Sequence, residues 1–419
     1  SIVKMFITGI VTLFSLMRVT FGDTIMDEDL KTNKEYQYDD MILTQEQYAL
    51  TKERGFFVPR KWPLRNGRVI VPFYFDASIP KGDPRRDAFK TAIKMYSRKT
   101  CIEWVETDRW DSEHKVQVYS GSGCNSNVGM LSESDNKLSL APNCVKVSTV
   151  VHEMGHAMGL VHTQSRDDRD KYVQVWWDNI QDGRQHNFDI KFGLEAFGVP
   201  YDYLSIMHYR NSYFSKNGSF TLTPREPFAM FMIGRERYDF RWSDAALLNK
   251  GLQCDEVFSQ TCGKQDCKNG GYVGKNCKCS CPENTQGDNC EIRTGPLFSY
   301  TPKCGGIIET EGDIQSDGFG VSSTTDVCIF HIKAPKCQKP QITITRVAFR
   351  GDYCDWNMLA IQVSQEYFGY MYCGNGKVPV GQAFISDSSE AAVYYYTTTK
   401  GSPSYGFKAN IKFLESSSC

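Results

Sequence analysis

Three histidines and one glutamate lie in one short segment, at spacings that suit a metal site. The residues are His152, Glu153, His156 and His162, with Gly159 between the last two histidines. Residues four apart lie on the same face of a helix, so His152 and His156 can converge on one ion. Glycine adopts backbone angles that other residues resist, so Gly159 can end the helix and turn the chain to bring in His162.

Three imidazole nitrogens suit one Zn²⁺ ion and leave a fourth position open to water, as in catalytic rather than structural zinc sites. Glu153 follows the first ligand and would take a proton from that water, whose pKa zinc lowers toward about 7. The alternative is a set of ordinary helix histidines. It is disfavoured because the chain has only 7 His and 34 Gly in 419 residues. We therefore expect a hydrolase with one Zn²⁺ per chain.

The segments around this motif predict an α+β fold. Residues 68–75 are rich in β-forming side chains and predict a strand, and residues 116–119 alternate like one. Residues 84–98 have helical spacing. The apolar neighbours of the histidines are expected to pack into the core; they are Met154, Ala157, Met158 and Leu160.

Sixteen cysteines, an even number, are concentrated from Cys254 onward. This density indicates a disulfide framework made in an oxidising compartment. Cytosolic zinc clusters are the alternative, but Cys277-x-Cys279-x-Cys281 does not match paired C-x2-C spacing. Lys and Arg number 48 against 49 Asp and Glu, a balance that argues against a nucleic-acid partner.

The pattern of the first residues predicts an export signal. Lys4 precedes an apolar run over 5–17, which has the length of a signal-peptide core; a membrane anchor is the alternative. No other stretch is long and apolar enough to cross a bilayer, so we expect no membrane span in the mature protein. Residues 23–54 are polar and charged and predict a solvated segment without core contacts, either a proregion or a disordered tail.

The histidine motif resembles that of the metzincins, which place a methionine turn beneath the zinc. Ser205-Ile-Met-His-Tyr209 supplies such a turn. The continuation Thr163-Gln-Ser-Arg-Asp-Asp-Arg-Asp170 narrows the resemblance to the astacin family, whose signature runs H-E-x-x-H-x-x-G-x-x-H-E-x-x-R-x-D-R-D. The resemblance implies that Met207 packs under the metal. It also implies that Tyr209 is a reversible zinc ligand that stabilises the tetrahedral intermediate. His208 has no implied role and is expected to be structural.

One residue departs from the family pattern. Astacins usually have Glu directly after the third histidine, where it anchors the new N-terminus after activation, and this chain has Thr163. A threonine cannot form an ion pair with an α-amino group. We expect the zinc chemistry to survive and the mature N-terminus to lose this anchor.

Many astacins are kept latent by a proregion motif Phe-x-Gly-Asp, whose Asp occupies the open zinc position. The closest match is Phe21-Gly22-Asp23, one residue short, which makes Asp23 a candidate ligand of the latent form. A plain loop aspartate is the alternative. Activation would require another protease to cut near Arg54, at a suitable distance from Trp62, which resembles an early Trp of the family.

The resemblance also implies a domain order. It consists of a signal peptide (1–20), a propeptide (21–54), a metzincin-like catalytic domain (55–254), a small disulfide-rich EGF-like module (258–291) and an all-β CUB sandwich (304–415). Period-2 runs at 341–347 and 391–397 agree with an all-β module. The implied disulfides are Cys101–Cys254, Cys124–Cys144, Cys262–Cys277, Cys267–Cys279, Cys281–Cys290, Cys304–Cys328, Cys354–Cys373 and Cys337–Cys419.

Two further positions bear on calcium binding and on glycosylation. Some CUB domains bind calcium through an acidic residue three positions after the third cysteine, but this chain has Asn357 there, which argues against calcium. Asn217-Gly-Ser219 is a glycosylation acceptor sequence of the kind found in surface loops of secreted proteins.

The sequence thus predicts a secreted zinc endopeptidase that cleaves extracellular proteins. Matrix, cuticle or eggshell proteins are the substrates that the resemblance suggests, since the module order is that of many nematode astacins. The alternative is an extracellular binding or adhesion protein with weak catalysis, acting through its EGF and CUB modules. Thr163 and the incomplete proregion motif are what support that alternative.

Overall fold

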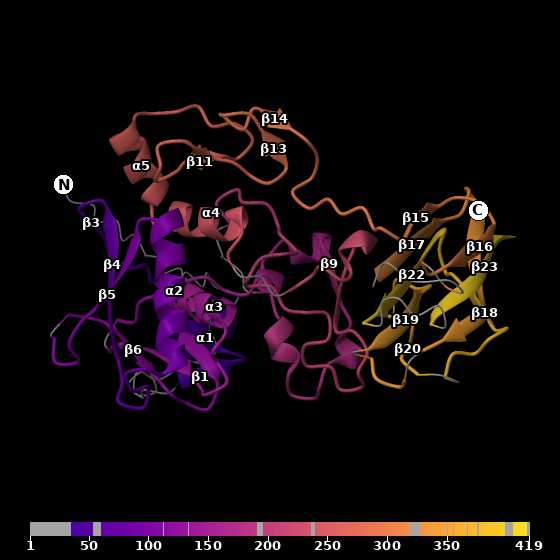
Figure 1. The fold of residues 1–419 in the computed structure, drawn as a ribbon, viewed down its shortest axis with the longest axis horizontal. Helices are drawn as coiled ribbons and strands as arrows, with labels where there is room; N and C mark the ends of the chain where they lie inside the picture. Colours follow the sequence, from indigo (N-terminus) through magenta and orange to yellow (C-terminus); the bar gives the residue numbers. More distant parts are fainter. Residues whose placement is uncertain are drawn as a thin grey trace, which may run out of the picture.

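The computed structural model describes residues 35–52, 60–111, 113–132, 134–190, 196–235, 239–317, 319, 327–349, 351–354, 356–366, 368–374, 377–398 and 405–416. The expected signal peptide, Asp23, Arg54 and Cys419 lie outside these residues. Figure 1 shows three parts: an α+β part at the left and centre, a cysteine-rich segment above it, and a β-sandwich at the right.

The α+β part is built on an eight-stranded sheet with the order β1-β2-β7-β8-β6-β4-β3, in which β5 also pairs with β4. The strands that follow residue 60 are β3 (Leu64–Arg65), β4 (Arg68–Phe75), β5 (Ile102–Glu106), β6 (Val116–Tyr119), β7 (Cys124–Asn127) and β8 (Asn136–Leu140). Helices α2 (Pro84–Lys99) and α3 (Val147–Ala157) pack against each other and on this sheet. The predicted strands at 68–75 and 116–119 and the predicted helix at 84–98 are confirmed.

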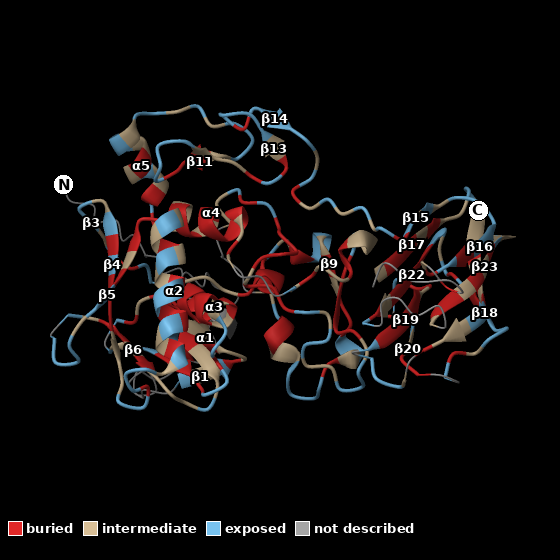
Figure 2. Cartoon of the chain, viewed as in Figure 1, coloured by how far each residue is buried: buried red, intermediate tan, exposed pale blue. Residues whose placement is uncertain are grey.

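The core between these helices and the sheet is apolar because each element presents one apolar face. Phe73 of β4, Phe89 and Tyr96 of α2 and Met154 of α3 belong to one buried cluster. Figure 2 shows the buried residues lining the inner face of α2, with its outer face exposed. Met154, Ala157 and Met158 are buried, as predicted, and Leu160 packs against the same cluster.

The prediction that residues 23–54 make no core contacts is wrong for the described stretch 35–52. Strands β1 (Glu35–Tyr38) and β2 (Met41–Thr44) form a hairpin, followed by α1 (Gln45–Lys52), and β2 pairs in parallel with β7. Tyr38, Met41 and Leu43 are buried against Val128. The segment is polar in composition, but these apolar residues alternate along the hairpin and share one face.

The second half of the α+β part has little regular structure. Strands β9 (Val173–Val175) and β10 (Leu222–Pro224) form a two-stranded ladder, and α4 (Trp242–Gly251) closes the domain. Short 3-10 turns link them: η2 (Thr163–Ser165), η3 (Arg169–Lys171), η4 (Trp177–Asn179), η5 (Gln185–Phe188) and η6 (Pro227–Ala229). A separate apolar cluster that includes Phe188, Tyr209 and Leu222 holds this half together.

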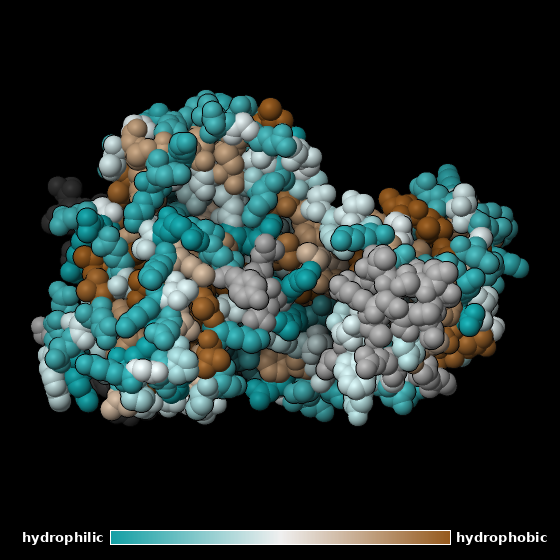
Figure 3. Space-filling model, viewed as in Figure 1, coloured by the Kyte–Doolittle hydropathy of each residue, from teal (hydrophilic) through white to brown (hydrophobic). Residues whose placement is uncertain are grey.

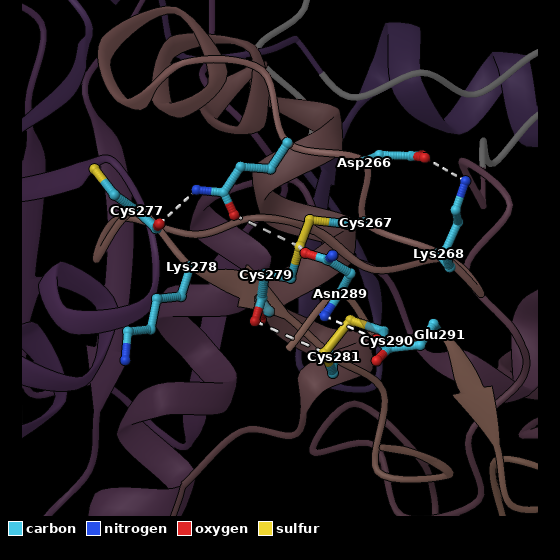
Figure 4. The surroundings of a disulfide bond; sticks show 12 residues. Asp266, Cys267, Lys268, Cys277, Lys278, Cys279, Cys281, Asn289, Cys290 and Glu291 are labelled. Atoms are coloured by element: carbon cyan, nitrogen blue, oxygen red, sulfur yellow. Dashed lines mark hydrogen bonds and ion pairs between the residues drawn. A yellow bond between two sulfur atoms is a disulfide. The ribbon is translucent and has the colours of Figure 1, made fainter. Parts of the chain in front are cut away.

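The cysteine-rich segment begins with α5 (Cys254–Cys262) and contains two small hairpins. They are β11 (Tyr272–Val273) with β12 (Cys279–Ser280), and β13 (Thr285–Gln286) with β14 (Ile292–Arg293). Figure 4 shows its disulfide-bonded cysteines, including Cys267, Cys279, Cys281 and Cys290. The segment packs on α4, where Trp242 Nε1 donates a hydrogen bond to the Ser280 carbonyl at 3.0 Å.

Within the described part of the chain, seven of the eight expected disulfides are present. They are Cys101–Cys254, Cys124–Cys144, Cys262–Cys277, Cys267–Cys279, Cys281–Cys290, Cys304–Cys328 and Cys354–Cys373. Cys419 is not described, so its pairing with Cys337 stays a prediction.

The C-terminal part is an all-β sandwich, as the period-2 runs predicted. One sheet has the order β15-β17-β22-β19-β20 and the other β16-β23-β18-β21. The strands are β15 (Gly305–Ile308), β16 (Gly312–Gln315), β17 (Val327–Lys333), β18 (Gln338–Ala348), β19 (Asn357–Gln362), β20 (Tyr370–Tyr372), β21 (Ala383–Ile385), β22 (Glu390–Thr397) and β23 (Gly406–Glu415). An apolar cluster that includes Ile342, Val393 and Phe407 fills the space between the sheets.

The face of the molecule drawn in Figure 3 is mostly polar. Figure 3 shows one face on which hydrophilic side chains predominate and hydrophobic ones form small separate groups. Among the described residues, no helix combines the length and the apolar character that crossing a membrane requires.

Candidate metal centre

Helix α3 carries the first two histidines and ends where the sequence predicted. The helix runs from Val147 to Ala157, and Gly159 adopts a φ of +98° in the turn that follows. Positive φ is a conformation that side-chain-bearing residues resist, so the glycine permits the reversal that brings His162 back toward the helix. Trp62, near the start of the domain, donates a 2.8 Å hydrogen bond from Nε1 to the Ala157 carbonyl and so fixes this end of α3.

The three histidines converge with one carboxylate. The Nε2 atoms of His152 and His156 are 3.1 Å apart. The Asp40 carboxylate lies 3.1 Å from Nε2 of His152, 3.3 Å from that of His156 and 2.9 Å from that of His162. Ligand atoms of a tetrahedral ion with bonds of about 2.0 Å are roughly 3.3 Å apart, so this spacing fits a zinc site.

The orientation of the rings supports the same assignment. The Nδ1 atom of His152 faces the Ile206 carbonyl at 2.8 Å, and that of His156 faces the Leu160 carbonyl at 2.8 Å. A carbonyl can only accept, so each Nδ1 carries the proton and each Nε2 presents its lone pair to the shared centre. This is the tautomer that a metal-binding histidine requires.

Several buried polar atoms at this centre make no hydrogen bond among the described residues, although Asp40 Oδ1 and His162 Nε2 face each other at 2.9 Å. They are Asp40 Oδ1, Glu153 Oε2 and His162 Nε2. Buried polar atoms are rarely left unpaired, and a cluster of them indicates a missing ion or water. Because the donor set is three imidazoles and one carboxylate, the residues fit Zn²⁺.

Glu153 lies beside the histidines at the wall of a cavity. Its side chain is buried, and it lines a cavity of about 590 Å³ together with His152, Tyr209 and Asp40. Burial, followed by the negative charge of Asp40, raises the pKa of Glu153 well above its usual range.

The methionine turn lies beneath the histidines. Met207 is buried, and a Cβ atom added to Gly155 of α3 would come within 3.0 Å of its Sδ atom, so the thioether packs directly on the metal-binding helix. Tyr209 is buried, and its ring lies 4.6 Å from the His162 ring. The structure thus places His152, Glu153, His156, His162, Met207 and Tyr209 close together, and their roles in binding and catalysis stay predictions.

Residues 58–253 match the family model of astacin, a family of peptidases. This part of the chain is an astacin domain. The whole chain is 29% identical over 409 residues to Blastula protease 10 of Paracentrotus lividus, which covers 94% of this chain and 64% of that protein. It is 30% identical over 341 residues to zinc metalloproteinase nas-34 of Caenorhabditis elegans, covering 78% of this chain and 53% of that one. The chain therefore spans less than two thirds of these relatives.

Among solved structures, high choriolytic enzyme 1, a hatching enzyme zinc-protease from medaka, matches 46% of this chain and 94% of its own. The sequence identity is 29% and the TM-score is 0.43.

The carboxylate at the centre of the astacin domain was missed by sequence reasoning, which proposed Asp23. Asp23 lies outside the described residues, and the structure places Asp40 at the site. Asp39 and Asp40 form the two-residue turn between β1 and β2, and Asp39 has a φ of +57°. Aspartate is among the residues that tolerate this conformation, and an Asp-Asp turn between alternating apolar residues was the available signal.

Thr163 is hydrogen-bonded to the methionine turn, so it has a structural role in this chain. Its hydroxyl donates a 2.8 Å hydrogen bond to Ser205 Oγ, which in turn donates to Asp244 of α4 at 2.6 Å. The Thr163 amide also donates to the Met207 carbonyl at 3.0 Å. The Asp244 carboxylate further accepts the amides of Ile206 and Arg241. This buried chain of hydrogen bonds connects the residue after His162 to α4.

His208 has the structural role expected for it. It is buried, with Nε2 at 2.6 Å from the Tyr201 hydroxyl and Nδ1 at 2.9 Å from the Tyr209 carbonyl. Nδ1 must donate to the carbonyl, so Nε2 accepts from the tyrosine. Burial lowers the pKa of His208 to about 4, which keeps the ring neutral.

Outside the astacin domain, Asn357 gives no support to a calcium site. It is buried in the sandwich, where its Oδ1 accepts a 3.1 Å hydrogen bond from Thr397. Asn217 is exposed, which agrees with a glycosylation acceptor, and its modification stays a prediction.

Proposed function

We propose that this protein is a zinc-dependent endopeptidase, with His152, His156 and His162 as the metal ligands. The observation that carries the proposal is the convergence of three imidazole Nε2 atoms beside a buried, partner-free Glu153 oxygen in an astacin domain. A donor set of three histidines leaves room for substrate or water, as catalysis requires.

The residues divide the work of peptide hydrolysis. Zinc, when bound, polarises the scissile carbonyl and makes a neighbouring water more acidic. Glu153, as its carboxylate in the active form, takes the proton of the attacking water and passes it to the leaving nitrogen. Tyr209 donates a hydrogen bond from its hydroxyl to the developing oxyanion. Met207 holds the floor of the site through its contact with α3.

Asp40 supplies latency in this proposal. Its carboxylate occupies the position opposite the three histidines, where water or substrate would otherwise bind. The proregion also covers the outer edge of β7 through β2, and such an edge is where an extended peptide can add as a strand. Removal of the proregion, by a cut near Arg54 made by another protease, would vacate both places and lower the pKa of Glu153 by taking away the charge of Asp40.

We further propose that the protein is secreted, with an EGF-like module over 258–291 and a CUB module over 304–415. Seven disulfides among the described residues support an oxidising compartment. The proposed substrates are extracellular proteins such as matrix, cuticle or eggshell components.

The test compares the chain starting at Gly55 with its Glu153→Gln variant. Zinc content is measured by metal analysis and cleavage is followed on gelatin, with and without a chelator. We expect both proteins to bind about one zinc and only the wild type to cleave, in a chelator-sensitive way. Two zinc-loaded proteins that both fail to cleave any protein would instead favour the extracellular binding protein.

A further inference from the structure

The C-terminal sandwich is fixed to the astacin domain by one of its sheets. Along β22, Ala391, Val393 and Tyr395 face the core between the two sheets. The alternating residues Ala392 and Tyr394 belong to a different cluster, which includes residues of the astacin domain. A sandwich sheet commonly leaves its outer face to solvent. Here both faces of β22 are buried, so the astacin domain covers the outer one.

Aromatic rings make this contact. Phe368 of the sandwich lies between Trp176 and Phe220 of the astacin domain, with ring centroids 5.8 Å and 5.1 Å away. Phe231 lies 6.3 Å from Tyr394 and 5.9 Å from Tyr396. Trp176, Phe220 and Phe368 are all less than a tenth exposed. In Figure 1 the sandwich lies against the part of the astacin domain that contains β9.

The residues that contact the sandwich also hold the loop that starts at the catalytic-site tyrosine. We call residues 209–214 the Tyr209 loop. The Asn211 carbonyl of this loop accepts hydrogen bonds from the amides of Thr221 and Leu222, and the Thr221 hydroxyl donates to the Tyr213 carbonyl at 2.7 Å. Thr221 directly follows Phe220, and its carbonyl accepts the Trp176 amide at 2.9 Å.

A second connection runs through the segment that begins at η6. The Asn211 side chain donates a 2.9 Å hydrogen bond to the carbonyl of Met230, which is buried in the interface cluster. Gly234, at the end of this segment, has a φ of +59°, and a Cβ atom there would lie 2.3 Å from the Tyr209 carbonyl oxygen. The backbone of this segment therefore packs directly on Tyr209.

We propose that the C-terminal sandwich is a positioning element for Tyr209, acting through Trp176, Phe220 and Met230. It would then raise turnover on any substrate, including peptides too short to touch the sandwich. A recruitment surface for large substrates, by contrast, would affect only substrates that reach it. The proposal rests on the peptidase activity proposed above only where cleavage rates are measured. The structural coupling can be tested without that activity.

The experiment weakens the contact by substitutions on the sandwich or on the astacin domain. It uses the full chain after removal of the proregion. Phe368→Ser changes the sandwich, Phe231→Ser changes the astacin domain, and Phe368→Leu should restore the apolar contact. Ile385→Ser is the control, because Ile385 is 52% exposed on β21 of the other sheet. Release is measured by small-angle scattering and by protease sensitivity of residues 294–303.

The first readout is hydrogen exchange at the amides of Thr221 and Leu222. We expect exchange to be at least about tenfold faster in the two serine variants, since these amides report the bonds to Asn211. The second readout is cleavage of a short peptide. We expect kcat to fall about 5- to 10-fold with little change in KM, a fraction of the effect of losing an oxyanion donor.

Either serine variant alone is sufficient to test the proposal. If one of them misfolds, the other still gives the result. Release of the sandwich without faster exchange or lower kcat would overturn the proposal and leave substrate recruitment as the role of the module. A wild type that cleaves no peptide would contradict the proposed function, and the exchange measurement would still decide the coupling.

Discussion

Asp40 Oδ1 lies 2.9 Å from Nε2 of His162, and this contact joins the proregion hairpin to the proposed metal centre. The same carboxylate reaches His152 and His156, so one side chain closes the position that three histidines leave open. Its negative charge also contributes to the raised pKa of Glu153. A single side chain thus lies where a fourth metal ligand would bind and contributes to the raised pKa of the proposed base.

Replacement of Asp40 should abolish latency. We expect the uncut chain carrying Asp40→Ala to cleave gelatin measurably, because both the blocking ligand and its charge are gone, while the uncut wild type stays inactive. The matched control is Asp39→Asn in the same turn, which keeps Asp40 and a residue that tolerates positive φ. Equal inactivity of all three uncut chains would show that the hairpin itself, and not Asp40, blocks the site.

Removal of the metal should destabilise the astacin domain. A ligand that binds only the folded state adds about 4 kcal/mol when its free concentration is 1,000 times its Kd. We therefore expect zinc to raise the melting temperature of the chain cut after Arg54 and a chelator to lower it. In His162→Ala this zinc dependence should be largely lost, whereas His186→Gln, outside the cluster, should keep it. A melting temperature that zinc raises equally in both variants would contradict the assignment of His162.

The histidine site was predictable because its geometry is local. Helical spacing sets His152 and His156 on one face, and Gly159 marks the turn before His162. Asp40 was not predictable in this way, since its place depends on the parallel pairing of β2 with the distant strand β7 and on a left-handed Asp39. The Asp-Asp turn favours a left-handed residue, but no local pattern in the sequence specifies the pairing of β2 with β7.

The contact between the sandwich and the astacin domain was partly predictable from the sequence of β22. The interpretation of 391–397 as a period-2 run is wrong for Ala391–Tyr396, which is apolar at every position, a pattern typical of a strand buried on both faces rather than on one. That pattern predicts a cover on the outer face of the sheet but does not identify it. The cover comes from Trp176, Phe220 and Phe231, which are scattered over irregular segments whose paths the sequence does not determine.

Thr163 should stabilise the metal site through its hydroxyl. Thr163→Val keeps the volume but removes the hydrogen bond to Ser205, so we expect a loss of about 1 to 2 kcal/mol in the free energy of unfolding. Zinc should bind more weakly because the loop after His162 is held less firmly to the methionine turn. Thr163→Ser, which keeps the hydroxyl, is the control. Chemical denaturation and zinc titration measure both effects, and identical values for valine and serine variants would refute this role.

His208 should make the protein sensitive to acid. Its pKa is about 4 in the fold, where burial disfavours the charged ring, against about 6.5 in the unfolded chain. The unfolded state therefore binds more protons between these values, and stability falls as the pH falls from about 6.5 to about 4. The full effect is on the order of 3 kcal/mol. Protonation would also place a proton on Nε2 of His208, which accepts a hydrogen bond from the Tyr201 hydroxyl, so two donors would then face each other.

The measurement compares unfolding of metal-free wild type and His208→Gln by urea at several pH values. Subtracting the two curves cancels the titration of the zinc-site histidines, which both proteins share. We expect the variant to be less stable at neutral pH, because it loses the fitted pair of hydrogen bonds, and to lose less stability on acidification. Parallel curves from pH 7 to pH 4 would mean that His208 titrates normally in the fold and that its two hydrogen bonds do not select the neutral ring.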